Sequence, residues 1–347
     1  MNVGRMNVGL TSRQRPNFNH ITGAGAQAWL QNAALSGLVL DWSGGDPRFN
    51  HWLRGRRFSS VSGGAMLPSV DFIRAGTRTA GGVTFGPNVD RSVPGLGFRS
   101  SNGATNEIRQ SDVMATQSFT VTAAPWTLSF TGTGSIALSG AFTGTLNGTG
   151  ATNRVALTFT PTAASLTMTV TGDVRLAQLE TGDFASDYVP NPNAGAGATA
   201  AADSLAAVAS VLPAGRMLIV MQTPFAVSTP STVQRLFTWF TPTNLLATRG
   251  ASSVTISGGT ESITLSGLSG RQRIAYLYEP GVAGRASANG AAVVVSTGVG
   301  PSVPTGGFAV AGNGGSAQLN DWTEWLAIAP VSGTLSDAQL QDIASLT

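Results

Sequence analysis

Residues 119–189 read FTVTAAPWTLSFTGTGSIALSGAFTGTLNGTGATNRVALTFTPTAASLTMTVTGDVRLAQLETGDFASDYV, and this stretch decides the fold class. Apolar residues alternate with threonine and serine at a period of two, as in Leu128/Phe130 and Leu166/Met168. In a pleated strand this period places one set of side chains on a core and the other on the opposite face. Gly-rich breaks between the runs mark turns. Several short strands at this spacing predict an antiparallel β-sandwich or jelly roll.

The C-terminal part returns to strand-like patterns. Asn289-Gly290 is a hairpin signal, because both central residues of a type I′ turn need a positive φ. Ser336 and Gln339 have the spacing of a capping box, which predicts a short helix that starts at Asp337. The expected strands are Met217–Met221, Leu236–Phe240, Val254–Ser257, Ser262–Leu265, Arg273–Tyr278, Ala292–Ser296, Phe308–Ala311 and Trp322–Ala329.

The sequence predicts a mainly β protein in four parts. Residues 1–67 form an arm and attachment region, residues 68–190 carry the first jelly roll, and residues 205–347 form a second β-sandwich. Between them, 191–204 is rich in Pro, Gly and Ala and is expected to be a linker without a core. Its Ala-rich part is expected to continue as a short helix over 199–212.

The composition bounds the classes of protein that are possible. The 347 residues contain no cysteine, so disulfides and thiolate metal sites cannot contribute. Only 11% of residues are charged and 44 are glycine, which suits a β-rich structural protein. No 18-residue apolar run occurs, and the N-terminus lacks the apolar core of a signal peptide. We expect synthesis in the cytoplasm and no membrane insertion.

Charge is distributed unevenly along the chain. Residues 1–110 hold 12 Arg against 5 acidic residues, a net of +7, whereas 111–347 hold 8 Arg against 12, a net of −4. A basic segment can bind nucleic acid, but no nucleic-acid-binding motif is present. Arginine also makes bidentate contacts to carboxylates across protein interfaces, so docking onto an acidic protein partner is favoured. The candidate attachment residues are Arg5, Arg13, Arg15, Arg54, Arg56 and Arg57.

Two segments carry a resemblance to a known family. The run from Arg175 to Pro190, RLAQLETGDFASDYVP, resembles the last strand and exit of carbohydrate-binding-module-like jelly rolls in tailed-phage fibre and spike proteins. SVDFIRAGTRT, which starts at Ser69, and GLGFRSSNGATN, which starts at Gly95, resemble the phage head spike fibre domain. The family has an acidic residue where Arg99 stands here. This resemblance implies a protein of the virion surface.

Residues 205–347 resemble a concanavalin A-like, laminin G-type jelly roll. The features that carry the resemblance are the Asn-Gly hairpin before a late strand and the closing LSDAQLQ helix, which starts at Leu335. The resemblance implies a lectin-like domain. Such a domain can hold calcium, but no clustered Asp/Asn loop demands it, and no other cofactor is indicated.

The sequence offers little for catalysis. Glycosidases that retain configuration on this fold need two carboxylates about 5–5.5 Å apart, usually in the motif E-x-D-x-E. Here Asp321 and Glu324 are three residues apart, which places them on opposite faces of a strand. With only His20 and His51, no Ser-His-Asp set is plausible. We therefore expect a protein that is not an enzyme.

Glycan binding needs aromatic faces and a few planar polar groups. For each aromatic residue the competing interpretation is a place in the core. The candidates for glycan contact are Trp322, Trp325, Asp321, Asn320 and Tyr278.

These observations predict a phage virion structural protein without enzymatic activity, a head spike or tail fibre, at the particle surface. It is expected to attach to capsid or tail proteins through its N-terminal region and to bind host-surface polysaccharide. A homo-oligomer, preferably a trimer, would multiply weak glycan contacts. One alternative is a purely structural capsid decoration or tail component that binds only virion proteins. A second alternative is a spike that degrades glycans.

Overall fold

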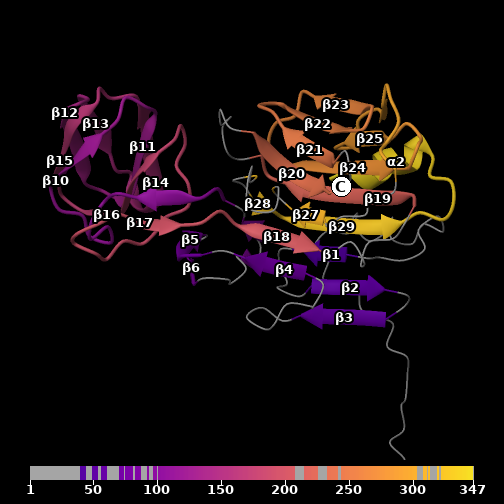
Figure 1. Ribbon diagram of the computed structural model, residues 1–347, viewed down its shortest axis with the longest axis horizontal. Coiled ribbons are helices and arrows are strands. Elements are labelled where there is room, and N and C mark those ends of the chain that lie inside the picture. Colours follow the sequence, from indigo (N-terminus) through magenta and orange to yellow (C-terminus); the bar gives the residue numbers. More distant parts are fainter. Residues whose placement is uncertain are drawn as a thin grey trace, which may run out of the picture.

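The computed structural model describes most of the chain from residue 101 onward and short segments before it. The described residues are 40–43, 49–53, 56–60, 70–73, 75–80, 83–86, 92–93, 97–99, 101–207, 215–225, 233–240, 244–302, 308–310, 312, 319 and 322–346. They form antiparallel sheets and the helix α2 (Asp337–Ala344). The expected mainly β fold with antiparallel sandwiches is therefore confirmed (Figure 1). In this part of the chain no helix is long and apolar enough to cross a membrane.

Residues 117–181 form the jelly roll, in which two sheets enclose one core. Trp126, Leu128 and Phe130 alternate with threonine and serine and are buried between the sheets. One sheet has the order β14-β11-β16 and the other has the order β10-β15-β12-β13. Its strands are β10 (Gln117–Val121), β11 (Trp126–Gly132), β12 (Ser135–Gly140), β13 (Gly144–Asn147), β14 (Gly150–Phe159), β15 (Ala164–Thr171) and β16 (Val174–Thr181).

The C-terminal sandwich consists of two larger sheets, with Trp239, Tyr276 and Phe308 buried between them. The 8-stranded sheet contains, in order, β26 (Val294–Val295), β25 (Arg285–Ala288), β24 (Gln272–Tyr278), β19 (Met217–Thr223), β29 (Trp325–Pro330), β1 (Leu40–Ser43), β2 (Phe49–Leu53) and β3 (Arg56–Ser60). The 7-stranded sheet contains β23 (Glu261–Ser266), β22 (Ser253–Gly258), β21 (Leu245–Arg249), β20 (Gln234–Trp239), β27 (Phe308–Val310), β18 (Ser204–Ala207) and β4 (Val70–Ile73).

Strands from the N-terminal region complete both sheets of the C-terminal sandwich. β1 pairs with β29, with Leu40 opposite Ile328, and β4 pairs with β18. The indigo strands β1, β2 and β3 therefore continue the sheet below β29 (Figure 1). The expected separate attachment region over residues 1–67 is wrong for these strands. The reason is that β29 and β18 present backbone hydrogen-bonding groups that an N-terminal strand satisfies.

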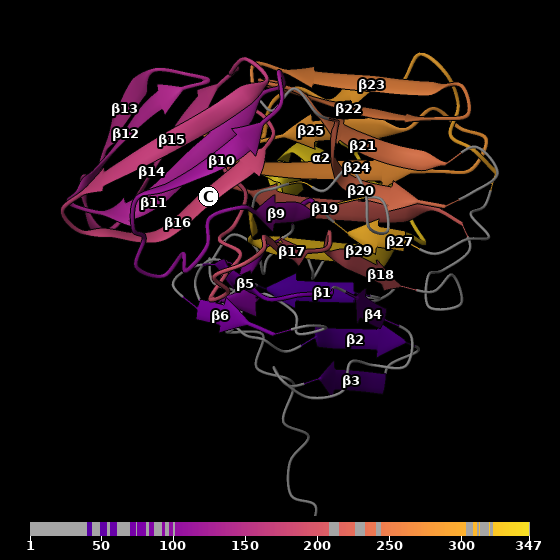
Figure 2. The ribbon, with the colours of Figure 1, turned by 60° about the vertical axis from the view of Figure 1, so that its left-hand side comes forward.

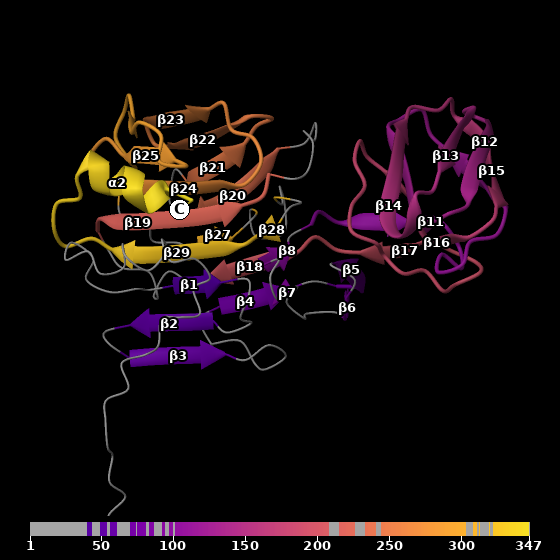
Figure 3. The same ribbon diagram turned by 180° about the vertical axis from the view of Figure 1, so that it is seen from behind.

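Along the sequence, the jelly roll is inserted between segments that contribute strands to the C-terminal sandwich. β8 (Gly97–Arg99), which precedes it, pairs with β28 (Trp322–Thr323), and the chain returns to the sandwich at β18. Figures 2 and 3 show the jelly roll to one side of the larger sandwich. The remaining short strands are β5 (Arg78–Ala80), β6 (Val83–Phe85), β7 (Ser92–Val93), β9 (Ala104–Asn106) and β17 (Ala198–Ala200).

The segment 191–204 is not a free linker, and this expectation is corrected. β17 within it pairs with β9, and Asn191 and Ala200 are fully buried. Asp203 accepts a hydrogen bond from the Ser101 backbone N–H at 2.8 Å. The helix expected from residue 199 is likewise replaced by β17 and β18. Pairing with distant backbone outweighs the local preference of alanine for helix.

The helix α2 starts where the sequence predicts. The Gln339 backbone N–H donates to Ser336 Oγ (3.2 Å), and the Ser336 N–H donates to Gln339 Oε1 (2.9 Å), which confirms the capping box. Leu340 and Ile343 pack onto the outer face of the 8-stranded sheet, in one apolar cluster with Leu218 and Leu277. The helix thereby covers the face of the sheet that points away from the main core.

Replacing Ser336 with alanine is expected to lower the free energy of unfolding by about 1 kcal/mol, because one N-terminal N–H of the helix loses its acceptor. Ser336→Asp keeps an acceptor and is expected to behave like the parent. Urea unfolding of the three proteins checks this, and equal losses for the two substitutions would contradict it.

Candidate functional site

The motif segments quoted from the sequence meet in space as one hydrogen-bonded cluster. The Gln178 side chain donates to Glu180 Oε1 (2.6 Å) and to Ser186 Oγ (2.9 Å), and the Ser186 N–H also donates to Glu180 Oε1 (2.8 Å). The Val189 N–H donates to Gln178 Oε1 at 2.7 Å. These contacts fold residues 182–189 back onto the outer face of the sheet that contains β16.

Asn106, from the second motif segment, joins the same cluster. Its Nδ2 donates to the carbonyls of Ala177 (3.0 Å) and Val189 (2.9 Å), and its Oδ1 accepts from the N–H groups of Ile108 (3.0 Å) and Leu179 (3.3 Å). The side chain is fully buried. Asn106 therefore links the segment that precedes the first strand of the jelly roll to the last strand and to the segment that follows it.

Three more buried residues complete this cluster. Arg78 donates to the carbonyls of Asp187 (3.3 Å) and Ala200 (3.2 Å). The Tyr188 hydroxyl donates to Asp112 Oδ1 (2.6 Å), and Asn191 Nδ2 donates to the Ile108 carbonyl (2.9 Å). We call the set Arg78, Asn106, Gln178, Glu180, Tyr188 and Asn191 the motif junction.

The motif junction is a structural element, since its side chains are buried and turned onto each other. Burial raises the pKa of Glu180, and hydrogen bonds from Ser186 and Gln178 and the charge of Arg154 oppose this only in part. Burial and the Asp112 carboxylate raise the pKa of Tyr188. Glu180 and Tyr188 are buried and hydrogen-bonded within the protein. They therefore stabilise the fold and cannot contact a glycan.

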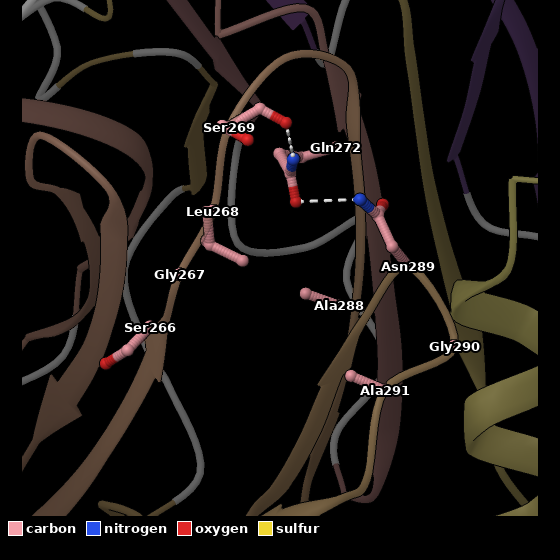
Figure 4. Close-up of a pocket in the computed structure, with 9 residues that line it drawn as sticks. All are labelled: Ser266, Gly267, Leu268, Ser269, Gln272, Ala288, Asn289, Gly290 and Ala291. Atoms are coloured by element: carbon pink, nitrogen blue, oxygen red, sulfur yellow. Dashed lines mark hydrogen bonds between the residues drawn. The ribbon is translucent and has the colours of Figure 1, made fainter.

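The surface of the C-terminal sandwich is hollowed at one end, where the loop after β23 faces the turn after β25 (Figure 4). The volume of this hollow is about 390 Å³. Leu268 and Ala288 are buried, whereas Ser266, Ser269 and Asn289 are exposed. The hollow is lined by Ser266, Gly267, Leu268, Ser269, Gln272, Ala288, Asn289, Gly290 and Ala291.

Two side-chain amides are held in place at the hollow. Gln272 Nε2 donates to the Ser269 carbonyl (2.6 Å), and Asn289 Nδ2 donates to Gln272 Oε1 (2.9 Å). Asn289 and Gly290 have φ values of 49° and 76°, which confirms the turn that the sequence predicts there. Hydroxyls and fixed amides beside an apolar floor are groups that hydrogen-bond to sugar hydroxyls.

A layer of polar side chains closes the core at the same end of the sandwich. The Arg249 guanidinium carbon lies 4.2 Å from the centre of the Phe225 ring. The layer consists of Thr223, Gln234, Arg249 and Gln272, all of which are buried. Each is two residues away, along its strand, from a residue of the apolar core: Met221, Leu236, Ala247 and Ile274, respectively. This end of the core is therefore closed by polar side chains, and one of them, Gln272, also lines the hollow.

Glu324 belongs to an ion-pair network at this end. Its Oε2 accepts from Arg271 Nε (2.6 Å) and from Gln222 Nε2 (2.7 Å), and Gln222 Oε1 accepts from Arg273 Nε (2.9 Å). Burial and the charge of Arg271 lower the pKa of Arg273, and Glu324 opposes the shift. These contacts fix the start of β29 to β19 and to the loop before β24.

The structure places the site residues predicted from the sequence in different environments. Tyr278 is fully buried, and its hydroxyl donates to the Pro301 carbonyl (2.8 Å), so it faces the core and cannot contact a glycan. Trp322 and Trp325 lie in β28 and β29, whose backbone starts at the end that carries the hollow. Asn320 and Asp321 lie outside the described residues, as do Arg5, Arg13, Arg15 and Arg54, whereas Arg56 and Arg57 lie in β3.

Sequence reasoning missed Gln272, Asn289 and Ser269 as site residues. Asn289-Gly290 was visible as a hairpin signal, but nothing local shows that Asn289 meets Gln272 across two strands. Among the described residues, no group of three or more His, Asp or Glu side chains could hold a metal ion.

Comparisons with known proteins give no family. No protein-family model matches the chain, and no curated protein matches it. Among solved structures, the chain is similar to domains LG4-5 of the mouse laminin alpha1 chain, with 9% identity and a TM-score of 0.24. The match covers 71% of this chain and 95% of that chain. At such a low TM-score the likeness carries no conclusion about function.

Proposed function

We propose that this protein is a structural component of a tailed-phage virion that binds a host-surface polysaccharide through the hollow. The observation that carries the glycan part is the hollow itself, where fixed amides and hydroxyls surround an apolar floor at an exposed end of the sandwich. The role requires no reaction, and Glu324, an acidic residue at this end, forms an ion pair with Arg271.

The resemblance of the quoted motifs to phage spike and fibre proteins supports the virion part of the proposal. Residues from three separated motif segments, Arg78, Asn106 and Gln178, lie in one cluster. A chance likeness of three short segments gives no reason for them to meet in space. In this proposal the protein works at the particle surface in several copies and attaches to capsid or tail proteins.

A purely structural virion component is the second candidate. It is favoured by the motif junction, because the motif residues hold the fold together and leave no side chain for a ligand. The two candidates differ in one respect, which is whether the hollow binds a sugar.

Filling the hollow is expected to weaken polysaccharide binding. The full chain is applied to an array of bacterial surface polysaccharides, because β1–β4 are part of the sandwich and a C-terminal fragment would lack them. Ser269→Trp, at an exposed lining position, is expected to weaken binding about tenfold or more, equivalent to ~1.4 kcal/mol. Ser262→Trp, at an exposed position near the other end of β23, is the matched control.

Absence of binding by the parent to every polysaccharide would favour the structural candidate. Equal losses for the two tryptophan variants would contradict the hollow as the binding site. Sugar released by the parent would instead support a glycan-degrading protein.

A further inference from the structure

Most of the jelly roll is free of charged residues. Between Asp112 and Asp173, Arg154 is the one charged residue in the sequence. Its guanidinium donates to Ser129 Oγ from Nε (3.1 Å) and Nη2 (2.7 Å). Ser129 lies in the sheet β14-β11-β16, so the opposite sheet, β10-β15-β12-β13, has no charged residue in any strand.

The outer face of this four-stranded sheet is exposed and rich in hydroxyl groups. Its inner face buries Phe119, Leu138 and Met168 in the core. Figures 1 and 3 place the sheet on the side of the jelly roll that is remote from the C-terminal sandwich. We call the outer residues the hydroxyl face: Ser118, Thr120, Ser135, Ala137, Ser139, Thr145, Asn147, Ser165, Thr167, Thr169 and Thr171.

The two edges of the sheet differ: at β10 the Arg109 guanidinium carbon lies 5.4 Å from the centre of the Phe119 ring, whereas β13 carries no charge of its own. β10 and β13 are the end strands, and β13, with the sequence GTLN, has neither charge nor proline. Natural edge strands are commonly blocked by charged residues or proline, which prevent contact with other chains. Depletion of charge is also what distinguishes the centre of a protein interface from the rest of the surface. Both features indicate that the hydroxyl face is covered in the working protein.

We infer that the hydroxyl face binds the hydroxyl face of a second copy of this chain. A hydroxyl both donates and accepts a hydrogen bond, as the pair Ser118 Oγ and Thr167 Oγ1 does at 3.0 Å. A surface of hydroxyls is therefore complementary to itself. The other 19 arginines lie outside 113–172, and the whole chain has a net charge of +3. Two copies thus avoid like-charge contact when they meet through this face.

Other partners fit this face less well. It presents no arginine that could pair with phosphates. A face that matches itself gives a two-fold pair, so this contact joins two copies and is not the contact of a threefold ring. The inference goes beyond the proposed function and uses a different surface from the hollow.

The area of the hydroxyl face determines how strongly two copies are expected to associate. Four strands about 4.8 Å apart and about six residues long present roughly 400 Å². A standard interface buries about 800 Å² on each partner. The contact is therefore weak in solution and becomes effective when copies are already held close together on a particle.

Sedimentation equilibrium of the full chain over about 1–500 µM tests the inference. The parent is expected to pass from monomer to dimer. Thr169→Arg, on the exposed face of β15, is expected to raise the dissociation constant at least tenfold, because like charges then meet. Thr264→Arg is the matched control, since Thr264 is an exposed strand threonine of the other sandwich, paired with Thr255 (Oγ1–Oγ1 3.4 Å).

A mixture of Thr169→Arg and Thr169→Glu proteins is expected to restore association, because opposite charges then face each other. Ser139→Arg is a second variant of the same face if Thr169→Arg does not fold. A monomer at all concentrations, equal effects of Thr169→Arg and Thr264→Arg, or no recovery in the mixture would overturn the inference. Polysaccharide binding at the hollow is measured separately on the same proteins and is expected to be unchanged by Thr169→Arg.

Discussion

Asn106→Ala is expected to lower the free energy of unfolding of the jelly roll by about 3–5 kcal/mol. The substitution leaves two buried carbonyls, of Ala177 and Val189, and two buried N–H groups, of Ile108 and Leu179, without this partner. Each such group costs about 1–3 kcal/mol when it is buried and unsatisfied, and relaxation recovers part of the total. The loss therefore exceeds that of a typical surface substitution several-fold.

Hydrogen exchange measured by mass spectrometry follows the jelly roll separately from the larger sandwich. Peptides from 117–181 are expected to exchange faster by two or more orders of magnitude in Asn106→Ala, equivalent to a loss of more than about 2.7 kcal/mol. Asn153→Ala, at an exposed position of β14, is the matched control and is expected to exchange like the parent. Similar protection in both variants would show that the motif junction does not stabilise the fold.

The second large effect concerns Glu261, which is buried in the core at the end of the sandwich remote from the hollow. Its Oε2 accepts from the Tyr276 hydroxyl at 2.9 Å. Burial raises its pKa from 4.5 to about 7, and hydrogen bonds from Tyr276 and the Gly284 backbone oppose this only in part. Burial of Tyr278 itself, together with the charge of Glu261, raises the pKa of Tyr278 to about 12.

The direction of the pH dependence follows from this shift. In the unfolded chain the carboxyl ionises near its ordinary value, 4.5, whereas in the folded protein it stays protonated until about pH 7. The stability contributed by this group is therefore fully present below pH 4.5 and is lost as the pH rises to about 7. The shift corresponds to about 3 kcal/mol.

Glu261→Gln is expected to remove this part of the pH dependence. Glutamine is neutral throughout and keeps an oxygen that accepts from Tyr276. The free energy of unfolding is measured with urea at pH 4.5 and at pH 8. Between these two values it is expected to fall by about 3 kcal/mol more in the parent than in the variant. Glu279→Gln, which removes a partly exposed carboxylate paired with Arg216, is the control. The same pH profile in the parent and in Glu261→Gln would contradict the assignment.

Local patterns in the sequence predict the jelly-roll strands and the C-terminal helix, but not β21, β25 or the strands that replace the helix expected over 199–212. Period-two alternation identifies the strands of the jelly roll, because each has one face on a core. The capping box at Ser336 and the turn at Asn289 also follow from short-range chemistry. The alternation of Ile274, Tyr276 and Tyr278 already places both tyrosines on one face with an isoleucine, which argues against Tyr278 as a surface residue.

The tertiary arrangement could not be predicted in the same way. Leu40–Ser43 pairs with a strand at the other end of the chain, and no local signal selects that partner. The Pro, Gly and Ala content of 191–204 indicates a linker, yet three-residue strands satisfy backbone groups there. Gln178 and Glu180 alternate with Leu179 as solvent-facing residues would, but residues 182–189 cover them. The hollow is formed by segments that are brought together only by the fold.

The end of the C-terminal sandwich around Ser269, Gln272 and Asn289 is proposed to bind a polysaccharide. Hydrogen exchange of the full chain, with and without the polysaccharide that binds best on the array, tests it most directly. Slower exchange confined to peptides that contain 266–272 and 288–291 is the predicted result. Protection that lies in the jelly roll instead, with these two segments unchanged at saturating polysaccharide, would show that the hollow is not the binding site.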